Sequence, residues 1–210
     1  MKTAAKGRRR VTRSTLRDEL FNMKRDRILA EAATLFYEQG YLPTTVSAIA
    51  KRLGVTKPFV YYHFHSKVDL LVEICERATR DALEAIESAT AMKARPLEKY
   101  ESFVRAFTRI VISNHTFVAV YFREELNLTA ESAERINAMR KAINRRLVDL
   151  LTAGVRAGEF EVEDPGMSAL MITGMASYAF AWYRGRGRLD PDSMTDEIVR
   201  MALKLVRKSG

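Results

Sequence analysis

Five side chains that can donate hydrogen bonds to an anion lie within eleven residues of one another, namely Lys57, Tyr61, Tyr62, His63 and Lys67. Phenol, imidazole and ammonium groups donate to phosphate oxygens, and the two lysines also contribute positive charge. The aromatic residues of this stretch could instead form the core of a small helical domain, which is the role we expect for Phe64. The cluster indicates phosphate binding if a short helix presents it.

The residues around this cluster predict two short helices joined by a tight turn. Thr45 can accept a bond from an orphan N–H of the first helix, and Gly54 can adopt the left-handed conformation that ends it. Apolar residues between them recur at helical spacing, namely Val46, Ile49, Ala50 and Leu53. Thr56 can cap the second helix, with Pro58 in its first turn. This pattern is a helix-turn-helix, whose second helix enters the major groove of DNA.

The sequence TVSAIAKRLGVTKPFVYYHFHSKVDLL, residues 45–71, resembles the DNA-binding domain of TetR-type repressors. The resemblance covers about Met23 to Leu71, and beyond it only the helix pattern and chain length are similar. It implies DNA contacts by Thr45, Lys57, Tyr61, Tyr62, His63 and Lys67. The chain departs from the family at Pro58 and Phe59, where relatives often carry smaller residues, so the base preference stays open. Our DNA-binding set is Thr45, Thr56, Lys57, Pro58, Phe59, Tyr61, Tyr62, His63 and Lys67.

The excess positive charge is confined to the same region. Residues 1–67 contain 14 Lys and Arg against 5 Asp and Glu, a net of +9, whereas residues 68–210 contain 21 of each. A local excess of this kind is what an attraction to phosphate requires. Part of it lies in the basic tract 1–21, which we expect to be a flexible arm. The arm either follows DNA phosphates and the minor groove or is a solvated tail.

The remaining pattern predicts helices throughout. Asn22 can cap a helix that ends at Gln39, and Ser66 can cap a second one of about 25 residues, roughly 37 Å long. Further helix starts occur at Pro96, His115, Thr129, Asp164-Pro165 and Asp190-Pro191. No segment alternates with period two, so we expect an all-α fold of about nine helices. Its predicted parts are the arm (1–21), the helix-turn-helix domain (22–67) and a helical ligand-binding and dimerisation bundle (68–210).

Aromatic and methionine side chains in the second part predict either a plain core or a pocket for an apolar small molecule. Tyr178 and Trp182 would each need a polar partner when buried. TetR-type proteins usually hold an effector in this part of the chain. Our ligand-binding set is Phe103, Phe107, Tyr121, Met139, Met175, Tyr178, Trp182, Arg184 and Arg186.

The two arginines of that set belong to the segment YRGRGRLDP, residues 183–191. The segment is similar to a loop of TetR-type regulators that respond to acyl-CoA thioesters. Guanidinium groups bind phosphates bidentately, and glycine allows a close backbone approach. Alternatively, these arginines pair with acidic residues of a partner subunit. We expect a homodimer through the last two helices, where Gly174 and Ala181 permit close packing.

Other classes of protein find little support in the sequence. His63 and His65 lie two residues apart, on different sides of a helix, and would form a poor metal pair. No catalytic constellation is visible, so we predict neither an enzyme nor a bound cofactor or metal. The single cysteine, Cys75, and the lack of a long apolar run indicate a cytoplasmic protein without a membrane span.

We therefore predict a DNA-binding transcriptional regulator. Its most favoured form is a ligand-released homodimeric repressor that binds a palindromic double-stranded operator and a small apolar effector, such as an acyl-CoA thioester. The alternative is a basic all-α small-molecule or acyl-carrier binding protein that does not bind an operator. The location of the charge favours the regulator.

Overall fold

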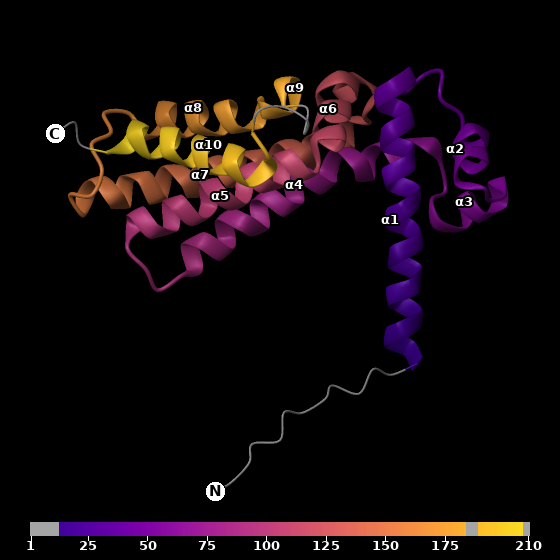
Figure 1. Ribbon diagram of the computed structural model, residues 1–210, viewed down its shortest axis with the longest axis horizontal. Coiled ribbons are helices and arrows are strands. Elements are labelled where there is room, and N and C mark those ends of the chain that lie inside the picture. Colours follow the sequence, from indigo (N-terminus) through magenta and orange to yellow (C-terminus); the bar gives the residue numbers. More distant parts are fainter. Residues whose placement is uncertain (1–12, 184–188, 208–210) are drawn as a thin grey trace, which may run out of the picture.

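The computed structural model describes residues 13–183 and 189–207. In that part of the chain all regular structure is helical, which confirms the all-α prediction (Figure 1). Nine α-helices result if α8 and α9, separated by Tyr178 alone, are counted together. The elements are α1 (Arg13–Gln39), α2 (Val46–Leu53), α3 (Lys57–His63), α4 (Lys67–Ala91), α5 (Pro96–Ser113), α6 (His115–Glu124), a 3-10 turn (Glu125–Asn127), α7 (Ala130–Arg156), α8 (Pro165–Ser177), α9 (Ala179–Trp182) and α10 (Pro191–Val206).

The two helices of the predicted helix-turn-helix, α2 and α3, form as expected. The Thr45 hydroxyl accepts a hydrogen bond from the N–H of Ala48 at 3.1 Å, which caps α2. Gly54 ends α2 in the left-handed conformation, with φ of +69°. Thr56 occupies the N-cap position of α3, but its hydroxyl makes no capping bond.

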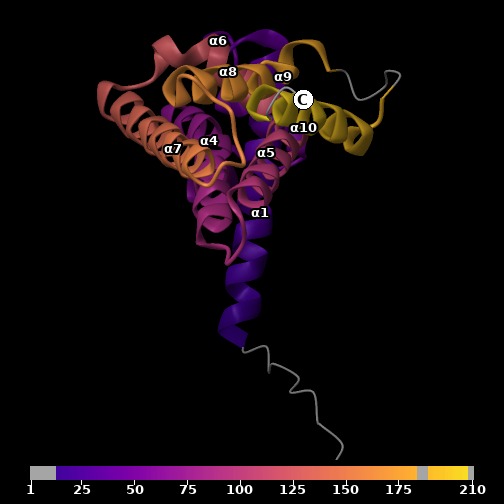
Figure 2. The ribbon, with the colours of Figure 1, turned by 90° about the vertical axis from the view of Figure 1, so that its left-hand side faces the viewer.

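Helix α1 starts at Arg13, nine residues before the predicted cap at Asn22. This start corrects the predicted boundary between a flexible arm and the first helix. No glycine or proline interrupts residues 13–39, so the helix continues toward the N-terminus. Residues 1–12 of the predicted arm lie outside the described part of the chain. In both views the start of α1 projects from the body of the molecule (Figures 1 and 2).

Helix α4 connects the helix-turn-helix to the remaining helices. Ser66 and Asp69 form the predicted capping box at its start, and the helix spans the predicted length of 25 residues. Its first turns contribute Leu70, Leu71 and Ile74 to the core that α1, α2 and α3 form. Its later turns contribute Ala82, Ile86 and Ala89 to a second core. The same helix therefore packs into both units.

The second core lies between α4, α5, α7, α8 and α10. Helices α8 and α10 cover one side of the group formed by α4, α5 and α7 (Figure 2). The Tyr100 hydroxyl on α5 donates to the carbonyl of Ala202 on α10 at 2.9 Å. The segment that we predicted as one helix from Asp164 to Trp182 is interrupted at Tyr178, which separates α8 from α9. No described helix is both long and apolar enough to span a bilayer.

Candidate nucleic-acid interface and internal cavity

Helix α3 presents most of the predicted DNA-binding residues to solvent. Lys57, Pro58 and Tyr62 are exposed, and Tyr61 is 40% exposed. The Lys57 ammonium lies 5.6 Å from the centre of the Tyr61 ring. This short surface thus combines a cation with two phenol hydroxyls, as a helix that binds a phosphate backbone requires.

The predicted residues beside this surface differ in how available they are. Thr56 is exposed, and its hydroxyl is not used for capping. Thr45 is exposed as well, although its hydroxyl already caps α2. Phe59 is only partly exposed and packs against the helix-turn-helix core. Lys24 of α1 lies 5.9 Å from the Phe59 ring centre, which adds a cation to the same side.

His63 does not belong to the exposed surface, which corrects its predicted phosphate contact. The side chain is 6% exposed, and neither ring nitrogen has a hydrogen-bond partner among the described residues. Its ring packs 4.6 Å from Phe21 and about as closely against Phe59 and Tyr62, at 5.1 Å each. Burial, reinforced by the nearby charges of Lys24 and Arg25, lowers the pKa of His63. His63 is therefore a neutral packing residue in this conformation. Phe64 is buried at 2% exposure, as expected.

Lys67 also has a different role from the one predicted. Its ammonium donates to the carbonyls of Tyr41, Leu42 and Thr44 at 2.9, 3.1 and 3.0 Å. It also lies 4.2 Å from the centre of the Tyr41 ring. An ammonium group has three donors, so none is left for a phosphate. Lys67 fixes the connection between α1 and α2 to the start of α4.

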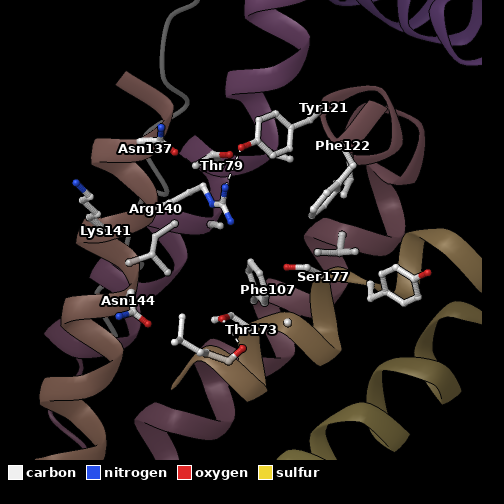
Figure 3. Close-up of a pocket in the computed structure, with 18 of the residues that line it drawn as sticks. Thr79, Phe107, Tyr121, Phe122, Asn137, Arg140, Lys141, Asn144, Thr173 and Ser177 are labelled. Carbon is white, nitrogen blue, oxygen red and sulfur yellow. Dashed lines mark hydrogen bonds between the residues drawn. The ribbon is translucent and has the colours of Figure 1, made fainter. Parts of the chain in front are cut away.

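A cavity of about 680 Å³ lies among α4, α5, α6, α7 and α8 (Figure 3). Its walls include Phe107 and Val111 of α5, Val118 of α6 and Ile143 of α7. Cys75 of α4 also lines it, and burial raises the pKa of that thiol to about 12. A cavity of this size with apolar walls is large enough for a small organic molecule.

One side of the cavity is polar. Figure 3 shows Arg140 extending from α7 into the cavity, where its Nη1 donates to the Tyr121 hydroxyl at 2.9 Å. The Oδ1 atom of Asn144 is buried and has no partner among the described residues. Polar side chains on α7 therefore face a cavity whose other walls are largely apolar.

The structure brings three of the predicted ligand-binding residues to this cavity, namely Phe107, Tyr121 and Tyr178. Phe103 is fully buried in the second core instead, and Met175 packs against that core. Met139 packs against the helix-turn-helix core, and Trp182 is 50% exposed and does not line the cavity. Arg184 and Arg186 lie outside the described residues.

Sequence reasoning missed the polar side of the cavity. Arg140, Lys141, Asn144 and Arg145 follow one another on α7 at spacings of one, three and four residues. Such spacings place side chains on one face of a helix, and this signal was present in the sequence. It was overlooked because charged residues on a helix usually face solvent.

Helix α6 links the cavity to the helix-turn-helix. It supplies Val118, Tyr121 and Phe122 to the cavity. At its far end Arg123 Nη1 donates to the carbonyl of Tyr37 at 2.7 Å. The neighbouring Glu124 accepts from the N–H of Tyr41 at 3.2 Å. A displacement of α6 by a bound molecule would therefore reach α1 directly.

A helix-turn-helix with an exposed cationic and phenolic helix, joined by α4 to a helical unit with an internal cavity, defines a DNA-binding transcriptional regulator. Sequence comparison agrees. Residues 28–74 match the family described as "Bacterial regulatory proteins, tetR family". Residues 93–206 match "Tetracyclin repressor-like, C-terminal domain". The chain belongs to the TetR family of transcriptional regulators, which confirms the resemblance noted in its sequence.

Several characterised proteins are similar over most of their length. The chain is 27% identical to the HTH-type transcriptional repressor KstR2 of Rhodococcus jostii (strain RHA1), covering 86% of this chain and 89% of KstR2. It is 28% identical to the fatty acid metabolism regulator protein of Bacillus subtilis (strain 168), covering 70% and 76%. The crystal structure of the TetR family regulator PfmR from Thermus thermophilus shares 30% identity and a TM-score of 0.77, covering 85% and 98%.

Proposed function

We propose that this regulator is a homodimeric repressor that leaves a palindromic operator when an effector enters the cavity between α4 and α8. The exposed Lys57, Tyr61 and Tyr62 of α3 carry the DNA half of the proposal. A single short helix offers few base contacts, so useful specificity requires two copies that read half-sites about 34–36 Å apart or a multiple of that distance. The KstR2 relative bears the name of a repressor, which supports repression over activation.

The dimer forms through α8 and α10. Both helices present apolar side chains to solvent in the single chain: Met167, Leu170, Met171, Met201 and Leu205 are each at least 42% exposed. A second copy that covers these side chains would remove them from water. The two helices of each subunit would then form a four-helix interface.

DNA binding belongs to the helix-turn-helix unit, predicted as residues 22–67, and effector binding and dimerisation belong to residues 68–210. Helix α4 spans the boundary, and α6 contacts α1 across it. An effector that displaces α4 or α6 changes the separation of the two α3 helices in the dimer. The regulator works in the cytoplasm, where its operator lies.

The proposed effector is an acyl-CoA thioester. The cavity has apolar walls for an acyl chain, and the relative from Bacillus subtilis is a regulator of fatty acid metabolism. A mobility-shift experiment on the DNA that flanks the coding region, repeated with a series of acyl-CoA thioesters and free acids, tests the proposal. We expect a shift that a thioester reverses. A shift that neither the thioesters nor the acids reverse would reject this effector class, and no shift at low salt would reject operator binding.

A further inference from the structure

The basic side chains of α7 occupy two different environments. Arg135 and Arg146 form ion pairs with glutamates of α4 and α7, at 2.7 to 3.0 Å. The basic residues that line the cavity have no carboxylate within 4.0 Å in the described part of the chain: Arg140, Lys141 and Arg145. Their positive charge is unmatched although other arginines on the same helix are paired.

No described residue of the cavity lining balances this charge. The twenty lining residues include those three basic side chains and no aspartate or glutamate. The opposite walls are apolar, with Phe107 and Val111 of α5 and Leu170 of α8. A site with one cationic side and apolar walls attracts a molecule with an anionic group and an apolar body.

Arg140 is the residue of the three that forms a hydrogen bond inside the cavity. Its partner, the Tyr121 hydroxyl, lies 2.9 Å from Nη1, and the guanidinium carbon lies 5.9 Å from the ring centre. Burial raises the pKa of Tyr121, so its hydroxyl is neutral at physiological pH. A carboxylate or phosphate is a stronger acceptor than a neutral hydroxyl, and it binds a guanidinium through two parallel bonds. An anion in the cavity would therefore displace Tyr121 from Arg140.

We propose that the effector is an anionic amphiphile, and that Arg140 selects it by exchanging the Tyr121 hydroxyl for the effector's anionic group. The inference rests on the proposed function, in which this cavity is the effector site. The apolar body of the effector packs against Phe107 and Val111 while its anionic group binds Arg140, with Lys141 and Arg145 adding positive potential. The anionic group is either a free carboxylate or a phosphate of a thioester's nucleotide portion.

Four probes with the same ten-carbon chain test the charge requirement on the full-length protein. Decanoate, decanoyl-CoA, decanol and decylamine are each added below the concentration at which they form micelles, and the melting temperature is measured. We expect at least one of the two anions to raise it, and neither the alcohol nor the amine to do so. Decanoate alone would identify a carboxylate, and decanoyl-CoA alone a thioester phosphate. No stabilisation by either anion, or equal stabilisation by decanol, would overturn the proposal.

Two substitutions test the exchange itself by calorimetric titration with the stabilising anion. Arg140→Met should weaken binding about tenfold, because a charge-assisted bond is lost. Tyr121→Phe should tighten it a few-fold, because the internal competitor for the guanidinium is removed. Arg146→Met is the matched control, since Arg146 lies on the same helix but pairs with Glu87 at 2.7 Å. Unchanged binding by the Arg140 variant, or equal losses in the two arginine variants, would overturn the proposal.

Operator binding is measured separately on the same samples by fluorescence anisotropy. Anion binding that follows Arg140, together with no operator binding, would reject the proposed function and leave the anion site in place. Operator binding that no anion affects, in a protein whose cavity does not bind the anions, would reject the anion site and leave the DNA-binding role in place. The two failures are therefore distinguishable.

Discussion

The carboxylate of Glu124 on α6 accepts a hydrogen bond from the backbone N–H of Tyr41 at 3.2 Å, although the two residues are 83 positions apart in the chain. Glu124 is 8% exposed, and its other oxygen accepts from Asn127 Nδ2 at 2.9 Å. Tyr41 in turn lies beneath the Lys67 ammonium. This bond joins the helix that lines the cavity to the corner at which α1 meets α2.

We expect Glu124→Ala to reduce the effect of effector on operator binding. The substitution removes the link between α6 and the α1–α2 corner, so the measured coupling free energy should fall by about 1 kcal/mol out of the usual range for allosteric proteins. Operator affinity is measured by fluorescence anisotropy with and without decanoyl-CoA. Glu124→Gln is the control because its amide oxygen can still accept from Tyr41. Equal coupling in the wild type and the alanine variant would show that the bond does not transmit the signal.

Lys67→Met should destabilise the helix-turn-helix rather than remove a DNA contact. The variant keeps the apolar part of the side chain but loses three hydrogen bonds to backbone carbonyls, at a cost of about 2 kcal/mol in the free energy of unfolding. Urea denaturation followed by circular dichroism measures this cost. Lys51→Met, at an exposed position of α2, should leave the free energy of unfolding unchanged. A Lys67 variant of normal stability that binds DNA poorly would restore the phosphate contact.

The buried His63 predicts a specific pH dependence of stability. In the unfolded chain the imidazole takes up a proton near its ordinary pKa of 6.5, whereas burial in the folded protein lowers the pKa. The unfolded state thus binds more protons below about pH 6.5, and the free energy of unfolding should fall as the pH drops through that value. Melting temperatures at pH 7.5 and 5.5 measure the effect. His63→Phe should reduce the difference, while His65→Asn, at an exposed position, should not.

Gly154 of α7 has no space for a side chain. A Cβ atom there would lie 1.9 Å from Cδ2 of Phe160, whose ring is 3% exposed and packs against Tyr100. Gly154→Ala should therefore lower the free energy of unfolding by about 1–3 kcal/mol, despite the higher helix propensity of alanine. Thermal and urea unfolding measure the loss. The double variant Gly154→Ala, Phe160→Leu offers a smaller side chain opposite the new methyl group and should recover part of it. A stabilised single variant would contradict the close contact.

The helices and their ends followed from the sequence because their signals are local. Thr45, Gly54 and Ser66 act within one turn of the backbone they cap, so the identity of neighbouring residues was sufficient to place α2 and the start of α4. The start of α1 was misplaced for the same reason. A strong cap signal at Asn22 was given more weight than the absence of a breaker before it. The confinement of the positive charge to residues 1–67 was also visible in the sequence and indicated the DNA-binding half.

What each side chain does was decided by tertiary contacts. His63 and Lys67 fit a phosphate-binding pattern by type and spacing, yet packing by Phe21 buries the first, and three distant carbonyls bind the second. Likewise, Arg140 looked like a solvated helix residue until α6 brought Tyr121 to it. The sequence by itself determined the family, the helices and the location of charge, since these depend on neighbours along the chain. Only the tertiary structure decided which polar groups remain free to bind a ligand, since residues far apart in sequence determine which of them are buried or already paired.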